Sequence, residues 1–163
     1  MRRFTLESLD SPRLAMKMIS YWPPYFFSGI KVVDFNDDLT QIKVRLKTSL
    51  INRNYKGTHF GGSLYSMIDP FYMFMMIHAM GPGYRVWDIS AKIDFIKATS
   101  NTVLAEFKLE PKVVKKVKNL TSSGEKHIES FLVEIREEVT NELVASAVKD
   151  VYVRKKLPKG KSK

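Results

Sequence analysis

The sequence contains no cysteine and only three histidines among its 163 residues. The absence of cysteine excludes disulfide bonds, thiolate metal ligands and a cysteine nucleophile. A chain without disulfides suits a reducing compartment, and we expect the protein to be cytoplasmic. Three scattered histidines without cysteine do not provide the ligand set of a zinc site, so no metal site is predicted.

Long uninterrupted apolar runs are also missing. The N-terminus begins Met1-Arg2-Arg3 but continues with acidic residues and without the apolar core of a signal peptide, so secretion is not expected. The most apolar segment, residues 64–80, is interrupted by Asp69, Pro70 and His78. It falls short of the roughly 20 apolar residues that a bilayer span requires, and no membrane span is predicted.

Positive charge exceeds negative charge, with a net charge of +10 at pH 7. Six of the 27 Lys and Arg residues lie in the last ten positions, so much of the excess belongs to a tail. A second cluster between Lys112 and Lys118 surrounds three valines. We interpret it as a solvated face, with attraction of an anionic ligand as the alternative. No base-stacking motif or recognition helix accompanies the charge, so specific nucleic-acid binding is not predicted.

The length suits one domain, because such a chain buries about two thirds of its unfolded surface without cross-links. Hydrophobic spacing predicts a helix over residues 11–21 that ends at Trp22-Pro23-Pro24. Three hairpins are predicted from pairs of strand-like segments: 28–35 with 40–48, 86–97 with 102–110, and 127–139 with 143–153. Residues 112–120 are predicted to form a short helix or an irregular excursion. We expect one domain over residues 1–154 and a basic tail over 155–163.

The apolar segment 64–80 follows the residues Gly57-Thr58-His59-Phe60-Gly61-Gly62 and is stopped by Gly81-Pro82-Gly83. It has no polar face to present to water. The simplest arrangement wraps an antiparallel sheet of six strands around one long central helix, which is an α+β architecture. Such a sheet has edge strands that a second protomer can cover, and we expect a homodimer.

Asp69 is the single carboxylate in this apolar segment, and burying an unpaired carboxylate is costly. Two interpretations stay open. In the first, Asp69 and Pro70 are the N-cap and first position of a helix, and the carboxylate accepts backbone N–H bonds. In the second, one helix over 62–80 is kinked or opened at Pro70, which cannot donate to the Ser66 carbonyl, and Asp69 faces a cleft or a dimer seam.

The order of the elements resembles the hotdog fold. The residues Asn54-x-x-Gly57-Thr58-x-x-Gly61-Gly62-x-Leu64, followed by Asp69, resemble the signature of PaaI-like acyl-CoA thioesterases and especially of a thioesterase-like group known as DUF4442. The likeness covers roughly residues 24–154. It implies a hotdog domain that hydrolyses an acyl-CoA or similar thioester, needs no cofactor because CoA arrives as part of the substrate, and forms a homodimer or a tetramer.

The resemblance also implies roles for individual residues. It assigns the oxyanion hole to the backbone N–H groups of Gly61 and Gly62, and the role of base or nucleophile to Asp69. In the relatives a histidine directly precedes the glycine pair; here Phe60 occupies that place and His59 lies one residue earlier. The substrate-binding candidates are Asn54, Gly57, Thr58, His59, Phe60 and Ser66.

Thioester hydrolysis requires an activated water or a nucleophile, together with donors directed at the oxygen that becomes negative. The hydroxyls of Thr58 and Ser66 lack a histidine placed to activate them. Arg53, Lys56 or the lysines between 112 and 118 are candidates to contact the phosphates of CoA. The alternative function is a noncatalytic hotdog module that binds an acyl chain or another apolar ligand, with Asp69 as a helix cap.

Overall fold

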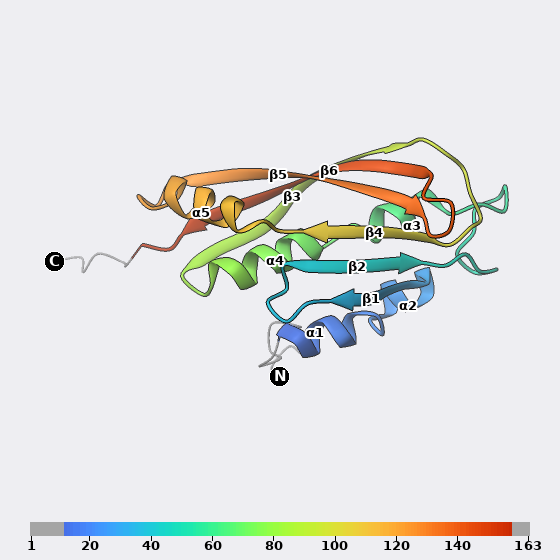
Figure 1. Cartoon of the computed structure of the whole chain (residues 1–163), viewed down its shortest axis with the longest axis horizontal. Coiled ribbons are helices and arrows are strands. Elements are labelled where there is room, and N and C mark those ends of the chain that lie inside the picture. Colours follow the sequence, from blue (N-terminus) through green and yellow to red (C-terminus); the bar gives the residue numbers. More distant parts are fainter. Residues whose placement is uncertain (1–11, 158–163) are drawn as a thin grey trace.

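The computed structural model describes residues 12–157 (Figure 1). Its elements in chain order are α1 (Pro12–Ile19), α2 (Pro23–Ser28), β1 (Ile30–Phe35), β2 (Gln41–Leu46), α3 (Gly61–Ser66), α4 (Phe71–Met80), β3 (Tyr84–Phe95), β4 (Val103–Lys108), α5 (Pro111–Leu120), β5 (Lys126–Glu137) and β6 (Leu143–Lys155).

The six strands form one antiparallel sheet in the order β1-β2-β4-β5-β6-β3, and α3 and α4 lie along one face of it (Figure 1). Alternation of polarity decides which face of each strand is buried: in β2, Ile42, Val44 and Leu46 are buried while the residues between them are partly exposed. The predicted α+β class, with an antiparallel sheet wrapped around a central helical segment, is confirmed.

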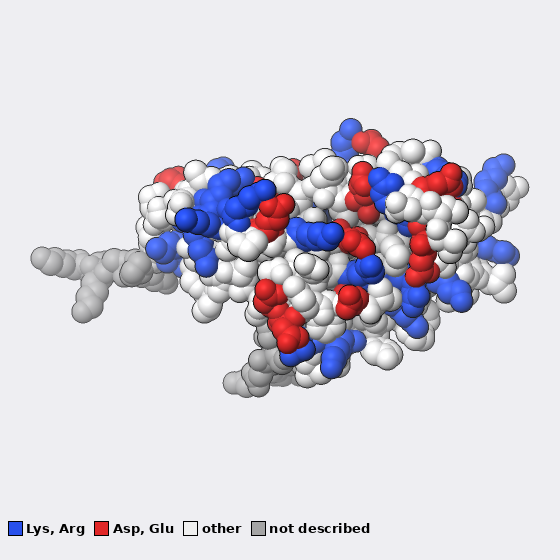
Figure 2. Space-filling model, in the orientation of Figure 1, with Lys and Arg blue, Asp and Glu red and all other residues white. Residues whose placement is uncertain are grey.

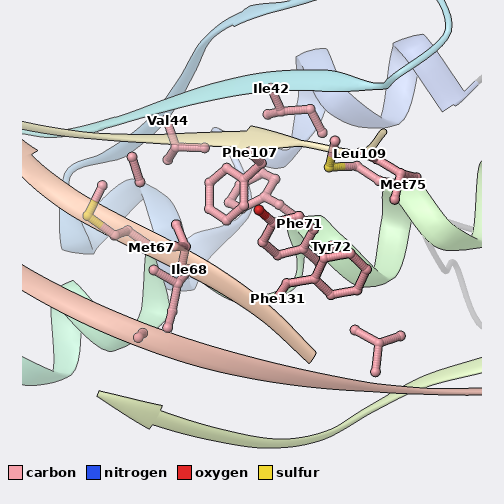
Figure 3. Packing of buried hydrophobic residues seen from close by; sticks show 14 of the residues in the cluster. Ile42, Val44, Met67, Ile68, Phe71, Tyr72, Met75, Phe107, Leu109 and Phe131 are labelled. Atoms are coloured by element: carbon pink, nitrogen blue, oxygen red, sulfur yellow. The ribbon is translucent and has the colours of Figure 1, made fainter. Parts of the chain in front are cut away.

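Aromatic rings of α4 pack against aromatic rings of the sheet (Figure 3). The ring of Tyr72 stacks on Phe131 of β5 at a centroid distance of 4.2 Å. The ring of Phe71 lies 5.0 Å from that of Phe107 on β4. Phe71 and Phe107 are fully buried, so α4 is held by the interior of the sheet rather than by its own propensity.

The pairing of the strands corrects one of the three predicted hairpins. Residues 28–35 with 40–48 and 127–139 with 143–153 pair as predicted, as β1 with β2 and β5 with β6. However, β3 and β4 do not pair: β3 pairs with β6, and β4 lies between β2 and β5. Because β3 has 12 residues, it finds a partner of matching length in the 13-residue β6, not in the six-residue β4. The connection from β3 to β4 therefore crosses from one edge of the sheet to its middle.

The N-terminal region contains a helix that the sequence did not predict. The predicted helix over 11–21 is shorter, as α1 ends at Ile19 and residue 11 lies outside the described residues. Pro23 and Pro24 then begin α2, where their fixed φ is compatible with the first turn and no N–H is required. Gly29 closes this helix with φ +75°, so the strand that we predicted from residue 28 starts at Ile30.

The central helical segment is divided at Pro70. Since proline has no N–H, the Ser66 carbonyl accepts instead from the Asp69 N–H at 3.2 Å, and four residues separate α3 from α4. The Asp69–Pro70 peptide bond is cis. The N-cap of α4 is Pro70 and no side chain caps it, so the prediction of a helix opened at Pro70 is confirmed and the prediction of Asp69 as its N-cap is wrong.

The C-terminal strand β6 runs to Lys155, one residue into the predicted basic tail. The part of that tail from residue 158 onward lies outside the described residues. Within residues 12–157, no helix has the length and apolar character needed to cross a membrane.

Candidate functional site

Asn54 organises the loop that leads to the glycine pair. Its side-chain Nδ2 donates to Thr58 Oγ1 at 2.8 Å and to the His59 carbonyl at 3.0 Å, while its Oδ1 accepts from the Lys56 N–H at 2.9 Å. Gly57 follows with φ +82°, a conformation that glycine adopts without strain. Asn54 and Gly57 therefore shape the loop, and Thr58 lies inside it.

His59 is a buried member of this loop, with 5% of its surface exposed. Its Nε2 lies 2.8 Å from the Asn101 carbonyl, and Thr48 Oγ1 lies 3.0 Å from the same nitrogen. Burial lowers the pKa of His59, although the bond to the Asn101 carbonyl opposes this. The imidazole therefore joins the glycine loop to the loop that follows β3.

Glu137 supports that second loop from β5. It accepts hydrogen bonds from Asn101 Nδ2 at 3.0 Å and Thr140 Oγ1 at 2.8 Å, and Lys97 Nζ lies 3.1 Å from its other oxygen. The hydrogen bonds from Thr99, Asn101 and Thr140, with Lys97, lower the pKa of Glu137 to about 2. At neutral pH Glu137 is therefore ionised, and it holds Asn101, whose carbonyl contacts His59.

A pocket of about 320 Å³ opens between these two loops, beside the start of α3. Asn54, Thr58, His59 and Gly61 line it together with Leu64, Phe95, Ile96, Lys97, Ala98, Thr99 and Val144. The pocket is the place where four of the predicted site residues meet.

The glycine pair forms the first turn of α3. Among residues 12–157, no acceptor receives the N–H of Gly61 or Gly62, as expected for the first turn of a helix. Aromatic rings cover both α-carbons: a Cβ added to Gly61 would lie 3.1 Å from Phe95 Cζ, and one added to Gly62 would lie 2.3 Å from Phe60 Cε1. Phe60 is itself 56% exposed.

Asp69 lies at the break between α3 and α4, where its side chain is 49% exposed. Its Oδ1 accepts from Lys149 Nζ at 2.5 Å, and this is its one side-chain hydrogen bond within the described chain. Lys149 projects from β6 onto the buried face of the sheet and is 4% exposed along its side chain. The ammonium also lies 3.2 Å from Asp88 Oδ2, which comes from the neighbouring strand β3.

These three residues and Tyr25 form what we call the helix-break cluster. Burial raises the pKa of Asp88 to about 6 against the lowering effect of Lys149, and the neighbouring carboxylate of Asp69 adds to the rise. Burial lowers the pKa of Lys149, but its bonds and charges with Asp69 and Asp88 outweigh burial and leave it raised. Tyr25 of α2 is buried, and its hydroxyl has no hydrogen-bond partner in the described chain. Burial, followed by the charges of Asp69 and Asp88, raises the pKa of Tyr25.

The predicted site residues thus fall into two groups. Asp69 does not line the pocket beside Gly61. The two residues are eight positions apart, with Gly61 at the start of α3 and Asp69 in the break that follows it. Ser66 lies between them, but its hydroxyl donates to the Gly62 carbonyl at 2.8 Å.

The basic candidates are also separated. Figure 1 places α5, which carries Lys112 to Lys118, at the opposite end of the molecule from α3. Figure 2 shows Lys and Arg side chains gathered at that end. Lys112 and Lys116 form ion pairs with Glu110 and Glu129, at 2.5 and 2.6 Å. Of the candidates for the CoA phosphates, Arg53 and Lys56 lie on the glycine loop.

Sequence reasoning missed Lys149, Asp88, Tyr25 and Phe95. A signal for two of them was present in the alternation of the strands. Lys149 has the same parity as the buried Ala147 and Val151, and Asp88 has the same parity as the buried Val86. A charged residue at an inward position of a strand indicates an ionic partner in the interior.

A family model described as "Domain of unknown function (DUF4442)" matches residues 12–153. The chain belongs to the DUF4442 family. No curated protein matches the sequence. The resemblance to this family that we drew from the residues between Asn54 and Asp69 is confirmed.

Solved structures similar to this DUF4442 chain share its fold. A protein of Pseudomonas aeruginosa, described as a probable thioesterase, has a TM-score of 0.77 at 13% identity, over 88% of this chain and 96% of that one. A thioesterase of Haemophilus influenzae has a TM-score of 0.63 at 16% identity, over 98% of this chain and 96% of that one. A protein of Streptococcus mutans, solved with acetyl CoA bound, has a TM-score of 0.55 at 16% identity, over 80% of this chain and 94% of that one.

Proposed function

We propose that this DUF4442 protein hydrolyses acyl-CoA-type thioesters, with Asp69 as general base or nucleophile and the N–H groups of Gly61 and Gly62 as the oxyanion hole. One observation carries the proposal: Asp69 is the half-exposed member of an otherwise buried ionic cluster at the break of the central helix. A purely structural ion pair would have no need of an exposed carboxylate at a helix break. Such a group can reach a water or a thioester.

Each step of hydrolysis has a candidate group. If Asp69 acts as base, it takes a proton from water while the water oxygen attacks the carbonyl carbon of the thioester. The oxygen that becomes negative is held by the unpartnered N–H groups at the start of α3. The carbon–sulfur bond then breaks, and the thiolate of CoA takes up a proton. The products are a carboxylic acid and free CoA.

We further propose a homodimer, because one chain leaves an edge of the sheet open and keeps Asp69 apart from the pocket beside Gly61. Strand β3 is paired with β6 on one side, and no described strand pairs with the other. The strand exposes large apolar side chains, among them Trp87, Ile89 and Phe95. Pairing of β3 with β3 of a second copy would cover this edge and bring a second set of site residues to the seam. Sedimentation of the parent as a dimer, and of Ile89→Lys as a monomer, is the expected result; a parent that sediments as a monomer contradicts it.

The test of the activity is release of free CoA from a panel of acyl-CoAs of increasing chain length. We expect turnover by the parent, and a loss of roughly a hundredfold or more in Asp69→Asn. Asp94→Asn is the matched control, since Asp94 is exposed on the outer face of β3 and, within residues 12–157, its ion pair is with Lys92 alone. Turnover that survives Asp69→Asn would exclude the mechanism.

A second function is favoured by a specific observation. Lys149 already donates to Oδ1 of Asp69, so the carboxylate also suits a noncatalytic module in which this ion pair fixes the helix break. In that module, the pocket beside Gly61 would hold an acyl chain. Stoichiometric binding of acyl-CoA without release of CoA would select this module.

A further inference from the structure

The helix-break cluster places two carboxylates on one ammonium. Lys149 Nζ lies 2.5 Å from Asp69 Oδ1 and 3.2 Å from Asp88 Oδ2. Asp88 and Lys149 reach the inner face of the sheet from adjacent strands, because Asp88 pairs with Val151 and Lys149 with Ala91. Three different elements, the helix break, β3 and β6, therefore meet at one cation.

The charges of this cluster do not balance. When both carboxylates are ionised, one positive charge faces two negative charges in a region where Lys149 is almost fully buried. Among residues 12–157, the other titratable neighbour is Tyr25 of α2, which is neutral at ordinary pH; burial and the two carboxylates raise its pKa further. A structural ion pair would be served better by one carboxylate, since uncompensated buried charge destabilises the fold.

The excess charge has a chemical use in the proposed reaction. A carboxylate that is fully neutralised by a lysine is a poor acceptor of a proton. If a second carboxylate shares the same ammonium, the first stays oriented but keeps its basicity. Asp69 is half-exposed, whereas the carboxylate oxygens of Asp88 are buried; the side-chain exposures are 49% and 17%. This difference assigns the reacting role to Asp69 and the supporting role to Asp88.

Building on the proposed function, we propose that Lys149 and Asp88 are positioning residues for Asp69: Lys149 fixes Oδ1 of the carboxylate, and Asp88 competes for the same ammonium so that Asp69 remains an effective proton acceptor. Neither residue contacts the substrate in this arrangement. Protonation of Asp88 ends the competition and leaves Lys149 to Asp69 alone. The reaction is therefore expected to slow as the pH falls through the range in which Asp88 takes up a proton.

The kinetic test compares parent, Asp88→Asn, Lys149→Met and Lys149→Arg across pH 5 to 9, at a temperature where all four are folded by circular dichroism. We expect Asp88→Asn to lower kcat roughly tenfold at pH 8 with little change in KM, and to remove the part of the acid limb that lies near pH 6. Lys149→Met is expected to lower kcat on the order of a hundredfold through misplacement of Asp69. Lys149→Arg keeps a cation and is expected to retain much of the kcat that Lys149→Met loses.

A purely structural role predicts a different pattern. It would change the fraction of folded protein but leave the acid limb of kcat unchanged, and this outcome overturns the proposal. Asp94→Asn again serves as control, because it removes a carboxylate of β3 on the opposite face of the sheet.

A second measurement separates this inference from the proposed function. Carbon-13 NMR of the aspartate carboxyl groups, assigned with Asp88→Asn and Asp69→Asn, follows both groups without any substrate. The inference expects the Asp69 signal to move during the titration of Asp88, because both carboxylates lie beside the Lys149 ammonium. If the acyl-CoA panel shows no turnover but this coupling is present, the proposed activity is wrong, and the claim that Asp69 and Asp88 share the Lys149 ammonium is supported. If the two signals titrate independently, the inference is wrong whatever the activity.

Discussion

The two halves of the candidate site are built in opposite ways. Around His59, nearly every polar group has a neutral or oppositely charged partner: Asn54 bonds the glycine loop, and Glu137 bonds the loop after β3. At the helix break, two carboxylates share one ammonium and a buried tyrosine hydroxyl has no partner. A network in which every polar group has a partner fixes a shape. A cluster with more negative than positive charge retains a carboxylate that can still react. We therefore expect the first region to be the more rigid, and the proposed chemistry belongs to the second.

Lys149→Met tests the unbalanced region most severely. Removal of the cation leaves Asp69 and Asp88 facing each other without compensation, which is expected to cost about 3 kcal/mol of unfolding free energy at pH 8. The effect depends on pH in a definite direction. Because the folded-state pKa of Asp88 is about 6 against an ordinary 3.8, folding binds a proton between these values, and stability falls as the pH rises through them. Urea unfolding should therefore find the variant closer to the parent at pH 5 than at pH 8.

Lys92→Met is the matched control for this substitution. Lys92 pairs with Asp94 on the exposed face of the same sheet, where its side chain is 80% exposed. Exposed pairs contribute little, so this control should change the unfolding free energy by less than about 0.5 kcal/mol. An equal effect of the two substitutions would contradict the interpretation of Lys149 as the cation of a buried cluster.

Glu137→Gln tests the satisfied region and has a smaller expected effect. The side-chain shape is kept while the charge and one acceptor oxygen are lost, so the urea midpoint at pH 7 should fall, but less than in Lys149→Met. The pH dependence has the opposite sign to that of Asp88. Since hydrogen bonds and Lys97 lower the pKa of Glu137 to about 2 from 4.5, its contribution is present above 4.5 and is lost as the pH falls toward 2. Parent and variant should therefore converge in acid, and a difference that persists at pH 2 would contradict this account.

Much of this comparison could not be predicted from the sequence, and the reasons are physical. The central apolar segment and the alternation in β2 are local properties, and they were predicted correctly. The opening at Pro70 was one of two interpretations that the local sequence left open, and the structure selects it. The pairing of β3 with β6 is not local: it depends on strand length and on the return of the chain past α3 and α4, so adjacency in sequence suggested the wrong partner. The helix α2 was missed because two prolines were interpreted only as a stop signal.

The candidate site divides in the same manner. The motif between Asn54 and Asp69 was identified from the sequence because it is contiguous, and the structure places four of its residues around one pocket. Lys149 lies 80 positions from Asp69, and no local pattern joins them. Strand parity could have placed Lys149 and Asp88 in the interior. It could not have placed them opposite Asp69, because that contact is made by the tertiary packing of the helix break on the sheet.

Gly62→Ala has the smallest expected effect and sharpens the role of the satisfied region. Gly62 does not have a positive φ, and the side chain that a Cβ would meet is the exposed ring of Phe60, which can rotate away. We expect a loss of less than about 0.5 kcal/mol. The substitution keeps the N–H, so the proposed acyl-CoA turnover should be retained within a few-fold.

Gly57→Ala is the matched comparison for Gly62→Ala. Nothing lies within 4 Å of a Cβ added to Gly57, yet its φ of +82° imposes a conformation that alanine adopts at a cost of roughly 1–2 kcal/mol. The melting temperature of Gly57→Ala should therefore be lower than that of Gly62→Ala, although a Cβ added to Gly62 makes the closer contact. The reverse order would mean that the ring over Gly62 is fixed, and that glycine is required at the start of α3 for space.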